Sequence, residues 1–201
     1  MTSPSPVFGA TDPVDLVRDW LASASETEVN DPNAIALATV DPAGVPNVRI
    51  VLLKEIDDEG FVFYTNYESR KGSEIAATGQ AAFTMHWKSC RRQVRARGPI
   101  SRIPDERSDA YFASRPLDSR LGAWASIQSQ PLADRGALET RIEEARARFG
   151  ENPPRPPHWG GFMLTPLEIE FWADVEFRLH DREAWRRDDL AKSWSARRLF
   201  P

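Results

Sequence analysis

Residues 34–65 read AIALATV-DPAG-VPNVRIVLLKEI-DDEG-FVFYT, and this stretch decides the fold. Its three apolar segments, 34–40, 45–56 and 61–65, have the β-branched and aromatic composition that is typical of strands. The D-P-A-G and D-D-E-G links between them have turn chemistry, because proline presets φ and glycine tolerates positive φ. Two short turns that join three strands predict an antiparallel meander.

Further elements of both kinds surround the meander. A helix is expected to begin at Pro13 with Asp12 as its N-cap, since apolar residues follow at helical spacing. Residues 69–78, with Ser69 as N-cap, and residues 104–114 and 131–149 are also expected to be helices, and 115–129 irregular or partly helical. Strands are expected over residues 80–87, 91–103, 161–171, 176–186 and 193–199. The pattern predicts an α+β, mainly β fold: an antiparallel sheet or small barrel with flanking helices.

The chain shows no internal repeat and no clear linker. Residues 1–11 are rich in proline, serine, threonine and glycine, and we expect a flexible N-terminal arm there. Residues 12–201 are then a single domain, which suits a chain of 201 residues.

Composition excludes several classes of protein. The formal net charge of −4 argues against nucleic acid as the main partner. A single cysteine, Cys90, rules out an internal disulfide framework and fits a reducing cytoplasm. No stretch approaches the roughly 20 apolar residues of a membrane helix, and the N-terminus lacks the pattern of a secretory signal.

Several familiar site motifs are absent from the sequence. There is no G-x-S-x-G elbow, no P-loop and no G-x-G-x-x-G fingerprint. His86, His158 and His180 are far apart in sequence, so a metal site would need ligands from distant segments, and none is predicted.

Cationic side chains recur instead at positions suited to an anion. Arg49 and Lys54 bracket an apolar strand segment, and Arg70-Lys71 open a helix, where backbone N–H groups also favour an anion. Two further groups are Arg91, Gln93, Arg95 and Arg97 on one strand face, and Arg115, Ser119 and Arg120 near Tyr111. Each alone is most simply a surface charge, but together, in an acidic protein, they favour a phosphorylated ligand. Strict alternation places Arg49 and Lys54 on opposite strand faces, unless a bulge lies between them.

The segment R-L-H-D-R at 178–182 offers the most promising set of ligand-binding and proton-transfer groups in the sequence. On a strand, Arg178, His180 and Arg182 share one face. Arginine offers a planar fork of donors for phosphate or carboxylate, and histidine titrates near neutral pH. The alternative is a solvated strand face with surface ion pairs.

Nine blocks carry a family resemblance when they are taken in order. They are R-I-V-L-L-K at 49–54, F-Y-T-N at 63–66, S-R-K at 69–71, R-R-Q-V-R at 91–95, Y-F-x-S-R-P-x-D-S at 111–119, G-A-W-x-S-x-Q-S at 122–129, W-G-G-F at 159–162, I-E-F-W at 169–172 and R-L-H-D-R at 178–182. Together the blocks resemble the pyridoxine/pyridoxamine 5'-phosphate oxidase family, from about residue 12 to the end of the chain.

The resemblance implies an FMN-binding split β-barrel that works as a homodimer, with flavin sites at the subunit interface. The implied FMN-contacting positions are Arg49, Ile50, Val51, Leu52, Leu53, Lys54, Tyr64, Thr65, Arg70, Lys71, Gln93, Gln128, Ser129, Trp172 and Arg182. The implied substrate positions are Lys54, Tyr111, Arg115, Ser119, Arg178 and His180, of which Arg178 and His180 are the catalytic candidates.

The activity that the resemblance implies is FMN-dependent oxidation of pyridoxamine and pyridoxine 5'-phosphates to pyridoxal 5'-phosphate. The substrate's C4' carbon gives hydride to flavin N5, and O2 accepts the electrons and is released as H2O2. The expected partners are a second copy of the chain and phosphorylated B6 vitamers, without nucleic acid or membrane, in the cytoplasm.

Two rival functions remain open at this point. One is another flavin oxidase of the same fold that acts on a phenazine precursor, against which the phosphate-binding set of Lys54, Tyr111, Arg115 and Ser119 argues. The other is a non-catalytic flavin- or pyridoxal-phosphate-binding protein, which would not need R-L-H-D-R. Two features depart from the family pattern: Asp174-Val175 stand where many members have glycine, and the N-terminal arm lacks an Arg-x-x-Tyr pair.

Overall fold

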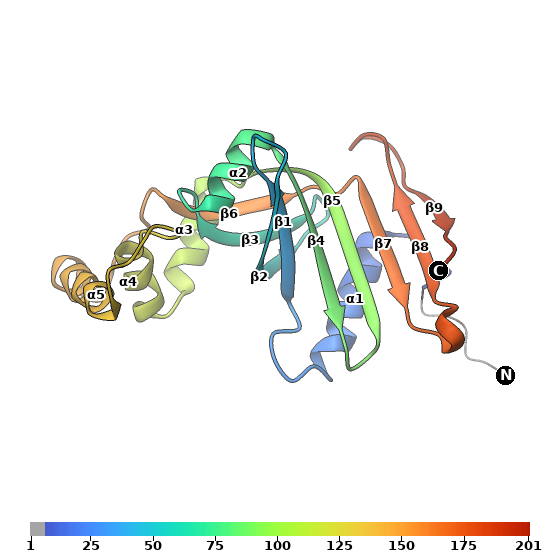
Figure 1. The fold of residues 1–201 in the computed structure, drawn as a ribbon, viewed down its shortest axis with the longest axis horizontal. Coiled ribbons are helices and arrows are strands. Elements are labelled where there is room, and N and C mark those ends of the chain that lie inside the picture. The colour runs from blue at the N-terminus through green and yellow to red at the C-terminus, as the bar shows by residue number, and fades with distance from the viewer. Residues whose placement is uncertain (1–6) are drawn as a thin grey trace.

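The computed structural model describes residues 7–201, in which strands form the body of the molecule and helices lie around it (Figure 1). The helices are α1 (Pro13–Ser25), α2 (Arg70–Thr78), α3 (Asp105–Ser114), α4 (Leu117–Ala125) and α5 (Arg135–Phe149). The strands are β1 (Ala34–Val40), β2 (Pro46–Ile56), β3 (Phe61–Asn66), β4 (Gln80–Trp87), β5 (Arg92–Arg102), β6 (Trp159–Leu164), β7 (Glu168–Ala173), β8 (Asp181–Arg186) and β9 (Ser195–Arg198). Every helix in this part of the chain is too short or too polar to cross a bilayer.

The predicted meander is present as β1, β2 and β3, and it forms half of a closed barrel. The strand order is β4-β1-β2-β3-β6-β5-β7-β8-β9, and an additional pairing of β4 with β5 closes six of these strands into a ring. Every pairing is antiparallel. The fold is therefore the predicted α+β, mainly β split barrel, with β7, β8 and β9 continuing outward from β5.

The barrel is filled by alternate side chains of its strands. In β1 the buried residues are Ile35, Leu37 and Thr39, as a period of two requires. Phe61 meets Phe83 edge to face at 5.0 Å between ring centroids, and Trp20 of α1 meets Phe171 of β7 at 5.2 Å. Such aromatic pairs add to the stability that burial provides, so α1 is held against the sheet beside the barrel.

The segment 161–171, predicted as one strand, is two. Residues 159–164 pair with β3 and with the far end of β5, whereas 168–173 pair with residues 92–97 of β5 and with β8. Between them Thr165 and Leu167 donate backbone hydrogen bonds to Pro99 and Arg97, and Pro166 has no N–H to donate. The break at Pro166 moves the chain from the barrel to its outer extension.

The prediction of one strand over residues 176–186 is also wrong, because the strand begins only at Asp181. Glu176–Arg178 is a 3-10 turn in which Phe177 and Arg178 have φ of 58° and 61°. The chain must reverse here because Asp181 pairs antiparallel with Ala173. Period-two alternation holds only within a strand, so Arg178, His180 and Arg182 do not form one strand face.

Two other boundaries differ from the prediction. The helix expected over 131–149 begins at Arg135, because Asp134 is its N-cap and accepts a hydrogen bond from the backbone N–H of Ala137. Of the arm expected over 1–11, residues 1–6 lie outside the described part. Val7 is fully buried, and the guanidinium of Arg198 lies 3.9 Å from the ring centroid of Phe8. Val7 and Phe8 thus lie against the domain.

Candidate functional site

A cleft of about 1000 Å³ opens beside β2, the N-terminus of α2 and the α4 segment. It brings together predicted site residues from five separate segments of the chain. They are Arg49, Ile50, Val51, Leu52, Lys54, Tyr64, Thr65, Arg70, Lys71, Tyr111, Arg115, Ser119, Gln128 and Ser129. Leu53 differs, because its side chain is buried in the core at 2% exposure.

A β-bulge in β2 lies at Lys54, and both Arg49 and Lys54 line the cleft. The pairing of β2 with β3 shifts register between Leu53 and Glu55, so Lys54 is the extra residue. A bulge re-aims the side chain at its position. Of the two alternatives that the sequence left open, the structure has the bulge.

One end of the cleft has the features of a phosphate site. Lys71 is 8% exposed, and its Nζ donates to Gln128 Oε1 at 2.8 Å and to Thr65 Oγ1 at 3.1 Å. Burial, together with the nearby charge of Arg49, lowers the pKa of Lys71 to about 8. A buried ammonium whose hydrogen-bond partners are neutral oxygens is suited to an anionic ligand, which would favour its charged form.

The carboxylate of Glu74 organises the arginines at this end. Glu74 is 3% exposed, and it accepts hydrogen bonds from Arg49 Nη2 at 3.1 Å and from Arg70 Nε at 3.1 Å. Thr39 and Asn47 donate to the same carboxylate. Burial raises the pKa of Glu74, but these four donors outweigh it and lower the pKa to about 2. Glu74 therefore holds two cations beside the cleft, and the spacing of Arg70 and Glu74, one helical turn apart, could have revealed it.

Replacing Glu74 with glutamine is expected to destabilise the protein at neutral pH by about 1–3 kcal/mol, because hydrogen bonds to a charged group are lost. The pKa of Glu74 is depressed on folding, so its contribution is present above about pH 4.5 and is lost as the pH falls toward about 2. Thermal unfolding of both proteins at fixed concentration should show their Tm difference shrink over that range. Glu68→Gln, an exposed control, should unfold like the wild type. A Tm difference for Glu74→Gln that is as large at pH 2 as at pH 7 would contradict the assignment.

The opposite end of the cleft combines stacked aromatic rings with an arginine. Tyr64 and Tyr111 stack at 3.9 Å, and Arg115 lies 4.7 Å above the ring of Trp159. The Nη1 atom of Arg115 is buried and has no hydrogen-bond partner in the described chain. Burial lowers the pKa of Arg115. A buried donor without an acceptor is costly, so this end also suits an anion.

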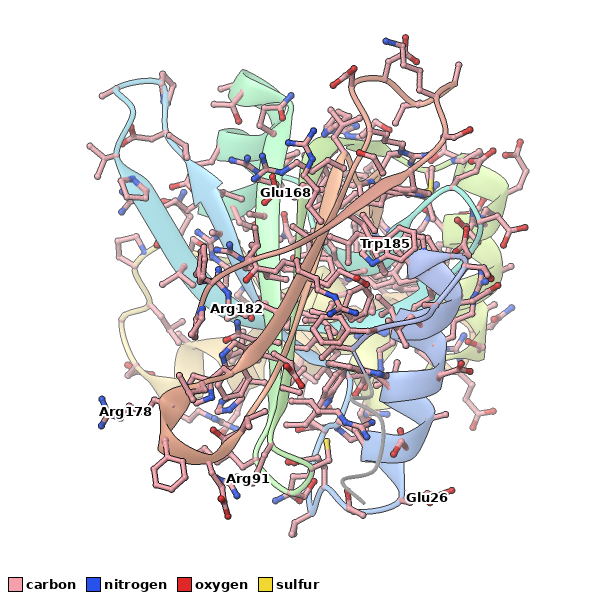
Figure 2. The ribbon with its side chains drawn as sticks, turned by 90° about the vertical axis from the view of Figure 1, so that its right-hand side faces the viewer. Glu26, Arg91, Glu168, Arg178, Arg182 and Trp185 are labelled. Atoms are coloured by element: carbon pink, nitrogen blue, oxygen red, sulfur yellow. The ribbon has the colours of Figure 1, made fainter. Side chains whose placement is uncertain are left out.

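The remaining predicted residues form a second group, which does not line the cleft. Trp172 of β7 lies opposite Gln93 of β5 and Arg182 of β8. Arg182 donates to Glu170 Oε1 at 2.8 Å and 3.0 Å, and the ring of His180 lies 4.6 Å from that of Trp172. Arg178 stands on the turn before β8 and points away from the body of the molecule (Figure 2).

The two groups lie on different parts of one chain. The cleft residues belong to the side of α2, α3 and α4, whereas the second group belongs to β7 and β8 on the other side of the barrel (Figure 1). Arg95 and Arg97, which were also candidate anion ligands, are paired instead with Glu170 and Glu168. One chain therefore presents two separate groups of predicted site residues.

The donors of the cleft group fit an FMN phosphate. Lys71, Arg49 and Arg70 offer charge, and the N-terminus of α2, capped by Ser69, adds the positive end of the helix dipole. Sequence reasoning missed Trp159 and Asn47, which also line the cleft. Trp159 belongs to the W-G-G-F block. Its neighbour Gly160 lets the strand approach Tyr67, because a Cβ on Gly160 would lie 2.1 Å from the hydroxyl of Tyr67.

Family models match almost the whole chain. Residues 21–149 match the model described as Pyridoxamine 5'-phosphate oxidase. Residues 159–201 match the model described as Pyridoxine 5'-phosphate oxidase C-terminal dimerisation region. The second match covers β6 to β9, and so includes most of the second group of predicted residues.

Individual relatives agree with the family models. A protein of Ruegeria sp. (strain TM1040), named pyridoxine/pyridoxamine 5'-phosphate oxidase, is 60% identical over 97% of each chain. One of the same name from Roseobacter denitrificans is 57% identical over the whole of both chains. A crystal structure of PhzG from Burkholderia lata 383, in complex with tetrahydrophenazine-1-carboxylic acid, has a TM-score of 0.92 and 34% identity, covering 100% of this chain and 98% of that one.

Proposed function

The chain belongs to the pyridoxamine 5'-phosphate oxidase family, and from this premise we propose that it oxidises pyridoxamine and pyridoxine 5'-phosphates to pyridoxal 5'-phosphate. It is an FMN-dependent oxidoreductase, with O2 as acceptor and H2O2 as product. Relatives that are 57–60% identical to this chain over nearly their whole length are named pyridoxine/pyridoxamine 5'-phosphate oxidase. That name supports this substrate class.

The observation that carries the proposal is the pair of anion sites in one cleft. Lys71, Arg49 and Arg70 stand at one end for the phosphate of FMN, and Arg115 and its neighbours at the other for the phosphate of the substrate. A phosphorylated flavin and a phosphorylated substrate need two such sites, whereas a single ligand with one phosphate needs only one.

FMN, when bound, supplies the two-electron acceptor, and the residues of the chain hold and orient the reactants. Arg49, Arg70 and Lys71 bind the flavin phosphate through charge-assisted hydrogen bonds. Lys54, Arg115, Ser119 and the hydroxyl of Tyr111 bind the substrate phosphate. Arg178 orients the substrate ring and stabilises developing charge, and His180 contacts the substrate beside it.

The family match to a dimerisation region supports a homodimer, and we propose that each site is shared across its interface. The cleft of one protomer would be completed by Gln93, Trp172, Arg178, His180 and Arg182 of the second group on the other. Two apolar side chains on β2 are exposed in the single chain, Val48 at 64% and Ile50 at 65%. They support a surface there that the partner subunit covers. Apolar side chains gathered at a polar cleft are typical of an interaction surface.

We further propose that residues 12–201 act as one domain and that the protein is cytoplasmic. The continuous sheet from β1 to β9 supports the single domain. The single thiol, Cys90, supports a reducing compartment.

The function is tested by identifying the cofactor and the product. Acid-released flavin should run as FMN on a column, and pyridoxamine 5'-phosphate should release peroxide from the FMN-loaded protein. FAD in place of FMN, or flavin without peroxide release for either vitamer, would refute the proposal.

Lys54→Ala and Arg115→Ala are expected to weaken substrate binding by about one to two decades, because each removes a charge-assisted hydrogen bond worth roughly 1.5–3 kcal/mol. The Kd of FMN should change much less. Substrate KM and fluorescence titration of FMN measure the two effects. Arg146→Ala, which removes an arginine that pairs with Asp118 outside the cleft, is the control. Equal losses for both ligands would show that these residues serve the flavin.

A second candidate is oxidation of a phenazine precursor, which the likeness to PhzG favours. That substrate carries a carboxylate and no phosphate. The same peroxide assay with tetrahydrophenazine-1-carboxylic acid separates the two, since activity on this compound alone would select the second candidate.

A further inference from the structure

Asp174 links the turn between β7 and β8 to His180. One oxygen of its carboxylate, Oδ1, lies 2.9 Å from His180 Nδ1, and the other contacts Arg91. The side chains of Asp174 and His180 are only 14% and 21% exposed. The three residues thus form a short chain of contacts, Arg91–Asp174–His180, beside the ring of Trp172.

Arg91 fixes Asp174 from two directions. The guanidinium of Arg91 contacts the carboxylate, and the backbone N–H of Asp174 donates to the carbonyl of Arg91 at 3.0 Å. Arg91 itself is held in a turn with φ of 55° between β4 and β5. The backbone hydrogen bond and the ion pair, whose Arg91 side chain is 74% exposed, both keep Asp174 beside this turn.

The contact between Asp174 and His180 decides which ring nitrogen carries a proton. A carboxylate accepts hydrogen bonds, so Nδ1 must be protonated to face Oδ1. The backbone N–H of Val175 donates a hydrogen bond to Nδ1 at 3.3 Å, which requires an unprotonated Nδ1. The carboxylate oxygen is closer, at 2.9 Å, and at that distance the lone pair of an unprotonated Nδ1 would repel it, so the contact favours a proton on Nδ1.

We propose that Asp174 is a positioning residue that keeps His180 protonated on Nδ1 and directs Nε2 toward the substrate. This rests on the proposed function, in which His180 contacts the substrate. The ring of Trp172 also contacts the imidazole, with centroids 4.6 Å apart. The imidazole is thereby restricted in both orientation and tautomer before substrate arrives.

The tautomer is measured directly by ¹⁵N NMR of the imidazole side chains in the FMN-loaded protein without substrate. The chain has only three histidines, so His180→Asn assigns the His180 signal by its loss. In the wild type Nδ1 should be protonated. Asp174→Ala should leave Nδ1 unprotonated in a large fraction of molecules. Asp174→Asn should retain the Nδ1 proton, because its amide oxygen can still accept a hydrogen bond. Glu176→Ala, which removes another carboxylate from the same turn, should leave the tautomer unchanged.

Activity is the second readout. Asp174→Ala should lower kcat/KM for pyridoxamine 5'-phosphate by roughly tenfold, because the substrate contact is no longer preorganised. The Kd of FMN should stay within about twofold, and Asp174→Asn should recover most of the loss.

Three results would overturn the inference: an unprotonated Nδ1 in the wild type, an unchanged tautomer in Asp174→Ala, or an altered tautomer with unchanged kcat/KM. A wild-type protein without oxidase activity would instead refute the proposed function. The tautomer would still decide whether Asp174 positions His180, because it is read without turnover.

Discussion

A purified heterodimer of two inactive variants is expected to recover about half of the wild-type activity per dimer, because two-fold symmetry assigns each shared site one half from each chain. One chain carries Lys54→Ala with Arg115→Ala, and the other carries Arg178→Ala with Arg182→Ala. Each homodimer lacks one half of both sites. The heterodimer has one site with both halves intact and one with both halves altered.

Co-expression with two different tags isolates the heterodimer, and peroxide release measures its activity. The matched control is a dimer whose two chains carry different tags but the same changes, Lys54→Ala and Arg115→Ala. It should stay inactive. If each protomer instead held a complete site, the mixed heterodimer would show no recovery. Light scattering should report twice the chain mass of 22.7 kDa.

Replacing Arg178 with alanine is expected to slow the chemical step by about 10²-fold, since a misplaced substrate ring is no longer in a near-attack geometry. Arg178→Lys should restore little of the rate, because a point charge does not replace the planar fork of donors. The measurement is anaerobic bleaching of the flavin by pyridoxamine 5'-phosphate in FMN-saturated protein, which separates this step from reoxidation by O2.

Arg197→Ala, on the exposed strand β9, is the control for loss of a surface charge and should bleach at the wild-type rate. Bleaching of Arg178→Ala at that same rate would leave the turn at 176–178 without a catalytic role. The exposed position of Arg178 in one chain makes the test informative, because the residue can act only if the partner's cleft lies next to it (Figure 2).

The sequence predicted the meander of β1, β2 and β3 because its turns are local. Each D-P-A-G or D-D-E-G link reverses the chain within a few residues, and the Asp41 and Asp57 carboxylates accept backbone hydrogen bonds inside their own turns. The helix at Arg70 was predicted for the same reason, since Ser69 caps it from the adjacent position. Interactions between close neighbours in sequence are visible in the sequence.

Tertiary structure alone decided the rest. The bulge at Lys54 depends on how β2 pairs with β3, and the break at Pro166 depends on β5, to which both β6 and β7 pair. R-L-H-D-R was read as a strand because alternation fitted it, but the pairing of Asp181 with Ala173 requires a turn before it. Such pairings join residues far apart in sequence, and a local pattern does not specify them.

The candidate site shows the same division. The residue types for two phosphates could be predicted, because charge and hydrogen-bonding capacity belong to the side chains themselves. Their distribution over a cleft and a separate β7–β8 group could not, and neither could the burial of Glu74 or the contact of Asp174 with His180. The sequence determined which chemistry is available; the closure of the barrel through β4 and β5 decided which side chains meet, because folding brings distant strands into register.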